Sequence, residues 1–230
     1  MTGQINEISW AKMPELFSGL AESDFRYLAS TATSRSYDRG EVLFFTGDAI
    51  DKVLMLVDGW VKITQTSEEG KEFIIRLHGP GEVVGELVAW FRGTHSSTAQ
   101  ALQECTVLVW NPATFNDAVE QFPRLGRNTR DLLKKRLTEL ERKFAEISMG
   151  TATPRLAYGL RILLKQMGQK TEEGVEINIA QEELGQMMAV DLYEVCRILR
   201  GWEQEGLVKL RRGAIGIKCV SRLQDLCRVK

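Results

Sequence analysis

The stretch IAQEELGQMMAVDLYEVCRILRGW (residues 179–202) contains two short helical patterns separated by a turn. Apolar residues recur in each pattern at spacings of three and four, which is typical of a helix with one buried face. Asp191 lies between the two patterns, where it is expected to cap the second helix, and Glu194 follows three residues later to complete a capping box. The stretch therefore predicts two helices joined by a tight turn. The buried residues are expected to be Leu184, Met187, Met188, Val195, Ile198, Leu199 and Trp202.

The opposite face of the second predicted helix is mixed and cationic. A helix that buries one side and exposes such a face is suited to the major groove of DNA. An ordinary helical hairpin packed on a core is the alternative that these residues leave open. The residues expected to contact DNA from this stretch are Gln181, Glu182, Leu192, Tyr193, Glu194, Cys196, Arg197 and Arg200.

The residues that follow favour the DNA-binding interpretation. Glu205-Gly206 ends the second helix, and LVKL (207–210) and AIGIKCV (214–220) predict two strands joined through a basic turn. Helix, turn, helix and basic hairpin in this order are typical of a winged helix-turn-helix. The wing cations are expected beside backbone phosphates, the alternative being a solvated hairpin tip. They are Lys209, Arg211, Arg212 and Lys218.

The composition bounds the class of protein. The 230 residues are 43% apolar and 27% charged, as in soluble globular proteins. No apolar run approaches a membrane span and MTGQINEISW lacks a signal pattern, so we expect a cytoplasmic chain with no membrane partner. The four cysteines form no C-x-x-C pair, which argues against zinc, an iron–sulfur cluster or a disulfide framework. Net charge is −1, but residues 151–230 carry 13 Lys and Arg against 10 Asp and Glu.

The first half of the chain predicts a β domain. After a short amphipathic helical start within residues 12–32, strand-like runs occur at 40–48, 51–66, 71–87 and 98–110. Glycine turns separate these runs, and Asp58-Gly59 is the strongest β-hairpin signal among them. Short, regularly spaced strands with turns predict a sandwich or a barrel.

A long helix is predicted over residues 113–149. Apolar residues recur in it at steps of four, three, four and three, which is the a/d seam of a two-stranded coiled coil. We expect a homodimer through this seam, the alternative being a helix packed onto its own β domain. The seam residues are Leu133, Leu137, Leu140, Phe144 and Ile147.

Thr153-Pro154 predicts the start of another helix, with the threonine as N-cap and the proline in the first turn. Residues 150–153 are therefore the expected hinge. The predicted domains are a sensing β domain (1–112), a dimerisation helix with the hinge (113–150) and a DNA-binding domain (151–230).

Taken together, these segments resemble the Crp-Fnr family, the catabolite-activator and fumarate-nitrate-reduction regulators. The matching stretches are LFSGL (16–20), RGEVLFFTGD (39–48), DGWVK (58–62), GPGEVVGEL (79–87), the 113–149 helix and ELGQMMAVDLYEVCRIL (183–199). The resemblance covers almost the whole chain. It implies an α+β protein with a cyclic-nucleotide-binding-like β-roll, a dimerisation helix and a C-terminal winged helix-turn-helix. It also implies a homodimeric, sequence-specific transcription regulator that binds double-stranded DNA, is controlled by a small-molecule effector and contacts RNA polymerase.

The effector pocket departs from that of the cAMP-binding members. Those members hold the cyclic phosphate with an arginine and a serine, and here the arginine position is Ser96. Because a buried phosphate needs a paired cation, we expect either a pocket not built for cAMP or a filled roll. Leu140 and Glu141 replace the hydroxyl pair that faces adenine. The expected pocket residues are Gly85, Glu86, Leu87, Arg92, His95, Ser96, Ser97, Thr98, Leu140 and Glu141.

Other effectors stay open, and the cofactor is unknown at this point. Iron–sulfur members use N-terminal cysteines, and no cysteine here precedes Cys105. Haem needs an axial ligand, for which His78 and His95 are available. A thiol switch at Cys196 competes with a purely structural role for that cysteine.

The predicted helix-turn-helix departs from the family pattern as well. Leu192 and Tyr193 occupy positions that commonly hold an Arg-Glu pair, while the later arginine is retained as Arg197, so the operator sequence of other members is not carried over. Ala180 is a poor N-cap for the first helix. The alternative function is a sensing module that acts through protein–protein contact after its reader has degenerated. An enzyme is not expected, because the sequence has no nucleophile elbow, P-loop or His/carboxylate cluster.

Overall fold

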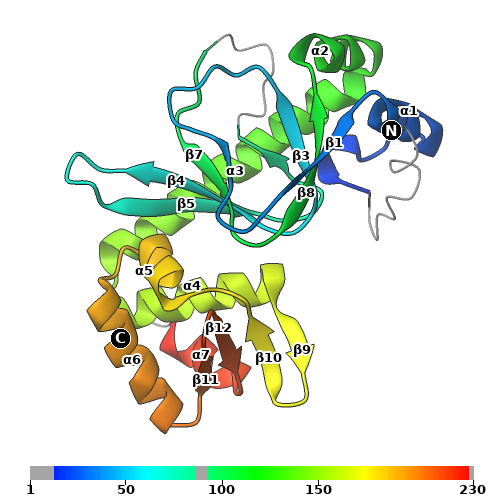
Figure 1. Cartoon of the computed structure of the whole chain (residues 1–230). Helices are drawn as coiled ribbons and strands as arrows, with labels where there is room; N and C mark the ends of the chain where they lie inside the picture. The colour runs from blue at the N-terminus through cyan, green and yellow to red at the C-terminus, as the bar shows by residue number, and fades with distance from the viewer. Residues whose placement is uncertain (1–12, 86–92, 228–230) are drawn as a thin grey trace. The chain divides into compact units, whose positions relative to one another are not determined.

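The computed structural model describes residues 13–85 and 93–227, and the chain divides into two compact units, each considered by itself. The first unit comprises residues 1–66 and 75–138, and the second comprises residues 67–74 and 139–230. Figure 1 shows the first as a β-rich body with helices and the second as a mainly helical body with a small sheet. The α+β class expected from the sequence is confirmed.

The described part of the first unit starts with the short helix η2 (Glu15–Phe17) and α1 (Glu22–Ser30) and continues into two four-stranded sheets. One sheet has the order β1 (Thr33–Tyr37), β8 (Cys105–Trp110), β3 (Val53–Asp58) and β6 (Val83–Val84). The other has the order β2 (Val42–Phe44), β7 (Thr98–Ala101), β4 (Val61–Thr66) and β5 (Glu72–His78). The described pairings are antiparallel. The predicted β domain is therefore present and consists of two sheets. β1 had not been predicted, because its sequence TSRSY is polar and four of its five residues are exposed.

The hairpin predicted at Asp58-Gly59 is wrong. β3 and β4, which flank this turn, lie in different sheets, so the chain passes from one sheet to the other at Gly59. Its φ is +86°, and an added Cβ would lie 2.3 Å from the carbonyl oxygen of Glu104. A glycine is required at this position for both reasons. The Asp-Gly dipeptide correctly predicted a local turn. It does not determine whether the two strands that flank the turn pair with each other.

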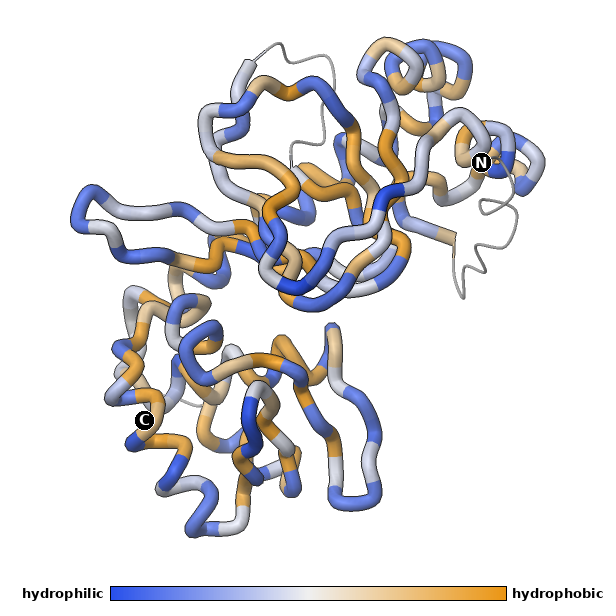
Figure 2. The backbone as a smooth tube through the Cα atoms, in the orientation of Figure 1, coloured by the Kyte–Doolittle hydropathy of each residue, from blue (hydrophilic) through white to orange (hydrophobic). Residues whose placement is uncertain are grey.

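Two apolar clusters of described residues belong to the core of the first unit. One joins the N-terminal helices to the β1–β8–β3–β6 sheet, where Phe17 lies 5.0 Å from Phe25 and 6.3 Å from Trp110 between ring centres. The indole Nε1 of Trp110 donates a hydrogen bond to the carbonyl oxygen of Leu28 at 2.9 Å. The other cluster lies between the sheets and includes Phe44. Figure 2 shows the corresponding hydrophobic stretches on the central strands.

The helix predicted over residues 113–149 is two helices, α2 (Pro112–Gln121) and α3 (Pro123–Met149). Phe122 between them has φ −118° and ψ 83°, outside the helical region. The reason is Pro123, since a proline disfavours helical conformation in the residue before it. The complete predicted seam lies on α3, so the break does not divide it.

The second unit contains the predicted helix-turn-helix. Besides the end of α3 from Glu139 onward, its helices are α4 (Ala152–Met167), α5 (Gln181–Met188), α6 (Leu192–Gln204) and α7 (Val220–Leu226). One sheet joins β11 (Val208–Arg211), β12 (Ala214–Ile217), β10 (Gly174–Ile177) and β9 (Gln169–Thr171) in that order. Three boundaries differ from the prediction. The strand expected over 207–210 is Val208–Arg211, and the strand expected over 214–220 ends at Ile217. Thr153 lies inside α4, while Thr151 holds the N-cap position.

Two features are absent from the residues that the structure describes. None of their helices combines the length and the apolar character that a membrane crossing needs. No group of three or more His, Cys, Asp or Glu residues among them is arranged to hold a metal ion.

Candidate nucleic-acid interface and effector pocket

The two predicted helices at 179–202 are present as α5 and α6, and their predicted apolar residues are buried. Ala189 ends α5 in the left-handed conformation, with φ 52°, and the amide of Val190 donates to the carbonyl oxygen of Gly185 at 3.0 Å. Arg155 of α4 donates to the carbonyl oxygen of Ala189 at 3.1 Å. The turn is therefore fixed from its own backbone and from α4.

The capping prediction is confirmed in one half. The amide of Tyr193 donates to Asp191 Oδ1 at 2.8 Å, so Asp191 caps α6. Glu194 does not complete the capping box. Its Oε1 instead lies 3.5 Å from Nη2 of Arg197, three residues later in α6. The reciprocal bond occurs on α5 instead, where Glu183 Oε2 accepts from the amide of Ala180 at 2.7 Å. Ala180 cannot cap with its own side chain, and Glu183 holds that helix start in its place.

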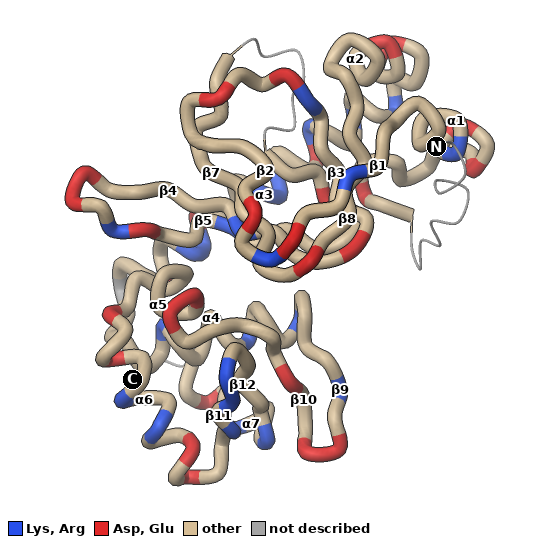
Figure 3. The backbone as a smooth tube through the Cα atoms, in the orientation of Figure 1, with Lys and Arg blue, Asp and Glu red and all other residues tan. Residues whose placement is uncertain are grey.

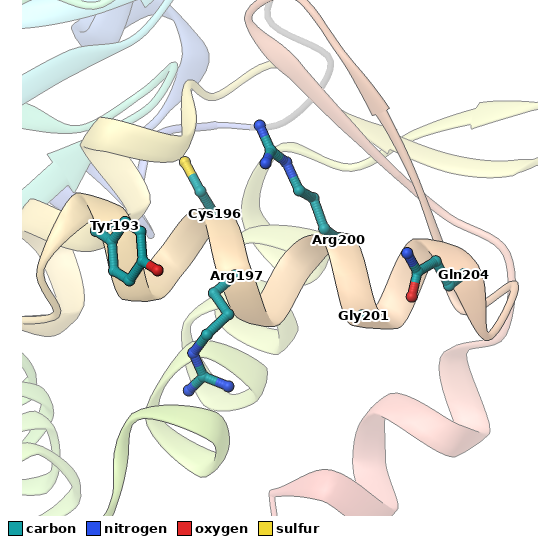
Figure 4. A pocket seen from close by; sticks show the side chains of 6 residues that line it. All are labelled: Tyr193, Cys196, Arg197, Arg200, Gly201 and Gln204. Carbon is teal, nitrogen blue, oxygen red and sulfur yellow. The ribbon is translucent and has the colours of Figure 1, made fainter.

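The exposed face of α6 carries a groove of about 470 Å³. Figure 4 shows Cys196 and Arg200 extending from one side of the helix and Arg197 from the other. Tyr193 is 79% exposed at the N-terminal end, and Gly201 has open space where a Cβ would stand. This face therefore offers an aromatic ring, two cations and close approach to the helix backbone. The lining residues are Tyr193, Cys196, Arg197, Arg200, Gly201 and Gln204.

Most of the predicted contact set from this stretch falls on or beside that face. Leu192 is exposed at the start of α6, and Glu182 is exposed and Gln181 half-buried at the start of α5. The sequence interpretation missed Gly201 and Gln204. Gln204 lies seven residues after Arg197, which places both on one side of the helix, so the spacing contained the signal.

The four predicted wing cations are not equivalent. Lys209 Nζ lies 2.9 and 2.7 Å from the two carboxylate oxygens of Glu173, and Arg211 Nη1 lies 2.7 Å from Glu176 Oε2. Arg211 Nη2 is also 3.5 Å from Glu173 Oε2. Arg212 and Lys218 are exposed. Figure 3 shows the acidic β9–β10 hairpin and the basic β11 in the same small sheet.

The expected effector residues are only partly brought together. The His95 ring is buried and stacked on Phe44, with centres 3.6 Å apart and an interplanar angle of 11°. Gly85, at φ +84°, lies against both rings, since an added Cβ would be 2.9 Å from Phe44 Cζ and 3.6 Å from His95 Cε1. Glu86, Leu87 and Arg92 lie outside the described residues. A hollow of about 250 Å³ adjoins the stack, lined by Leu43, Phe44, Asp48, Ala49, Asp51, Lys52, Leu54 and His95.

The remaining expected pocket residues have separate surroundings. The carbonyl oxygen of Ser96 accepts from Gln65 Nε2 at 3.2 Å, Ser97 is buried, and Thr98 Oγ1 accepts from the amide of Thr46 at 3.1 Å. Leu140 and Glu141 are exposed on α3.

Arg136 is a residue that the sequence interpretation missed. Its Nη1 donates to the carbonyl oxygen of Gly85 at 2.8 Å, and its Nη2 donates to that of Val83. Arg76 Nη2 in turn donates to the carbonyl oxygen of Arg136 at 3.1 Å. The guanidinium group of Arg136 therefore lies at the glycine of the Gly-Glu-Leu motif, and that of Arg76 contacts the Arg136 backbone. A separation of 51 residues between Gly85 and Arg136 gives no sequence signal for this contact.

The second histidine considered as a haem ligand has a different setting. His78 is 1% exposed, with Nδ1 3.4 Å from Glu82 Oε2. Burial lowers the pKa of His78, against the opposing effect of the neighbouring Glu82 carboxylate. The imidazole is buried next to a carboxylate, an arrangement that indicates a structural role for His78.

The seam on α3 leaves an apolar stripe uncovered. Leu133, Leu137, Leu140 and Phe144 are exposed, Phe144 by 71%, and Ile147 is half-buried. Such contiguous apolar residues on a surface helix are typical of an interaction face.

Comparison with known proteins finds a family match in each half of the chain. Residues 34–122 match the family described as cyclic nucleotide-binding domain, and residues 155–226 match the Crp-like helix-turn-helix domain. The chain is 28% identical over 211 residues to the Cyclic AMP receptor protein of Thermus thermophilus, covering 92% of this chain and 95% of the relative. FixK2 from Bradyrhizobium japonicum shares the fold with a TM-score of 0.76 at 19% identity, covering 86% of this chain and 98% of FixK2. The c-di-GMP responsive global regulator CLP of Xanthomonas campestris also gives 0.76, at 20% identity, covering 86% of this chain and 100% of CLP.

Proposed function

Because this chain belongs to the Crp-Fnr family of transcription regulators, we propose that it is a cytoplasmic homodimer that reads palindromic DNA under the control of a small effector other than cAMP. Its helix-turn-helix domain and its relatives make it a DNA-binding regulator rather than an enzyme. RNA polymerase is the proposed protein partner, by analogy with the family.

The observation that carries the proposal is the exposed face of α6. Asp191 fixes the start of this helix, and Tyr193 and Arg197 then lie four residues apart on its outer side. An arginine in this position can grip a guanine edge, and Leu192 can contact a thymine methyl group. Two such helices in a two-fold dimer would enter successive major grooves, about 34–36 Å apart.

The effector proposal is supported by the absence of an arginine at Ser96 and by the use of Arg136 on two backbone carbonyls. A cyclic phosphate bound at residues 96–98 would lack the charge-assisted bidentate partner that arginine provides. We therefore expect no tight cAMP binding. Calorimetry with cAMP tests this directly, and mass spectrometry of ligand that co-purifies with the protein would identify the alternative. Micromolar cAMP affinity would overturn this part of the proposal.

Two observations on the helix-turn-helix domain favour a second function. Tyr193 and Leu192 stand where the family commonly has a charged pair, and two wing cations are engaged by carboxylates. A sensing module that acts through protein–protein contact would tolerate both features. Only the DNA-binding function predicts sequence-selective, salt-dependent binding to duplexes.

The test is a binding selection from random duplexes, followed by titrations at several salt concentrations. Arg197→Ala should cost about 1–3 kcal/mol per site and relax the sequence preference, because a base contact is lost. Arg212→Ala should weaken all sequences alike and reduce the salt slope by about one, because a phosphate contact is lost. Arg26→Ala on α1 is the control, since Arg26 forms an exposed pair with Glu22 within the first unit. Failure to enrich a palindrome, or parental affinity in Arg197→Ala, would refute groove reading.

A further inference from the structure

One face of the small sheet in the second unit carries a network of opposite charges. Lys209 of β11 pairs in register with Gly216 of β12, and Gly216 pairs in register with Glu176 of β10. These three residues form one row across three strands. Side chains alternate between the faces of a strand, so Arg211 lies on the same face as Lys209. The cations of the wing and the carboxylate of β10 therefore share a surface.

Gly216 makes this network reachable across the intervening strand. An added Cβ there would lie 3.5 Å from Lys209 Cβ, so a larger residue would occupy the path between β11 and β10. Because Gly216 has no side chain, Arg211 reaches Glu176 at 2.7 Å across β12. Lys209 reaches Glu173, in the turn between β9 and β10, at 2.7 and 2.9 Å.

We propose that Glu173 and Glu176 are internal competitors of DNA phosphate, which hold Lys209 and Arg211 in the free protein and limit its sequence-independent affinity for DNA. This inference rests on the proposed DNA-binding function. It makes the β9–β10 hairpin a determinant of affinity, while base reading is left to α6. Arg212 and Lys218 are then the wing residues that meet phosphate without first leaving these carboxylates.

The chemistry of the two ligands is the same. A carboxylate and a phosphate oxygen both accept charge-assisted hydrogen bonds from lysine and arginine, and arginine binds either group in a bidentate manner. A phosphate contact releases counterions and strengthens the salt dependence of binding, whereas a cation already held by a carboxylate contributes less. The pKa of Glu173 is lowered by the hydrogen bond from Lys209, by its charge and by those of Arg211 and Lys218. Glu173 is accordingly ionised at neutral pH and available as a competitor.

The experiment compares DNA affinity and salt slope in the full chain. The double variant Glu173→Gln/Glu176→Gln keeps side-chain shape and removes both charges. It should bind the selected duplex and a scrambled one tighter by a similar factor of about two to ten, with a salt slope steeper by about one to two per chain. Glu172→Gln is the matched control, because Glu172 is exposed in the same turn and makes none of the described contacts to Lys209 or Arg211. The control should change affinity by less than the double variant.

A double-mutant cycle sharpens the test. Lys209→Gln should cost little in the parent and should remove much of the gain in the double variant, since Lys209 reaches phosphate only when its carboxylate is absent. Thermal melting by circular dichroism verifies that each variant is folded. If the parent binds its selected site and the double variant binds with equal affinity and slope, the inference is overturned and the DNA-binding function stands. If Glu172→Gln matches the double variant, net charge explains the effect and the inference also fails. If neither parent nor variants bind DNA, both proposals fall.

Discussion

Replacing Leu137 on α3 with alanine should weaken the proposed homodimer. Leu137 is 56% exposed in the single chain, so more than half of its surface remains to be covered by a partner. Full burial of a leucine side chain is worth about 1.5–3 kcal/mol, so the uncovered share corresponds to about 0.8–1.7 kcal/mol. Two-fold symmetry doubles this to about 1.7–3.4 kcal/mol per dimer, which is about a 20- to 300-fold weaker association.

Sedimentation velocity over a range of protein concentrations measures this change as a shift of the monomer–dimer midpoint. Tyr27→Ala on α1 is the matched control, because Tyr27 is also 56% exposed but lies outside the seam. It should leave the midpoint unchanged. Leu140→Lys, which places a charge in the same seam, should give a monomer at concentrations where the parent is dimeric. The seam assignment is wrong if Leu137→Ala keeps the parental midpoint, or if Tyr27→Ala moves it equally.

Three further predictions concern single positions in the described structure. His78 has a lowered pKa, so below about pH 6.5 the unfolded chain binds a proton that the folded chain excludes; stability should fall as pH drops from 6.5 to 5, and His78→Asn should flatten this dependence in chemical denaturation. Burial raises the pKa of Cys105 to about 11, whereas a hydrogen bond with Ser221 lowers that of Cys219, so alkylation of the native protein near pH 8, followed by mass spectrometry, should label Cys219 before Cys105. Gly59→Ala should lower the melting temperature more than Gly40→Ala, because both have positive φ but only Gly59 has a backbone atom where the new methyl group would stand.

The sequence predicted those parts of the molecule that depend on local periodicity. The buried stripes of α5 and α6 follow from spacings of three and four, and the Asp191 cap from a residue type at a helix start. The errors arose where a distant partner decides the structure. β1 has no apolar alternation of its own and exists because β8 pairs with it from Thr33 to Tyr37. Gly59 is required where the chain passes between the sheets, because Glu104 and Cys105 leave no room for a Cβ.

The same distinction governs the candidate sites. Tyr193 and Arg197 share a face because they are four residues apart on one helix, so their role could be proposed without a structure. The state of the wing could not, because Lys209 and Glu173 are 36 residues apart and meet only through the order β11, β12, β10. A count of four cations in the wing sequence therefore overstates the charge that DNA meets. Two of the four, Lys209 and Arg211, are already paired with carboxylates of the β9–β10 hairpin. Paired residues must be subtracted before a salt slope is predicted from a basic hairpin, and the Glu173→Gln/Glu176→Gln measurement determines how large that subtraction is.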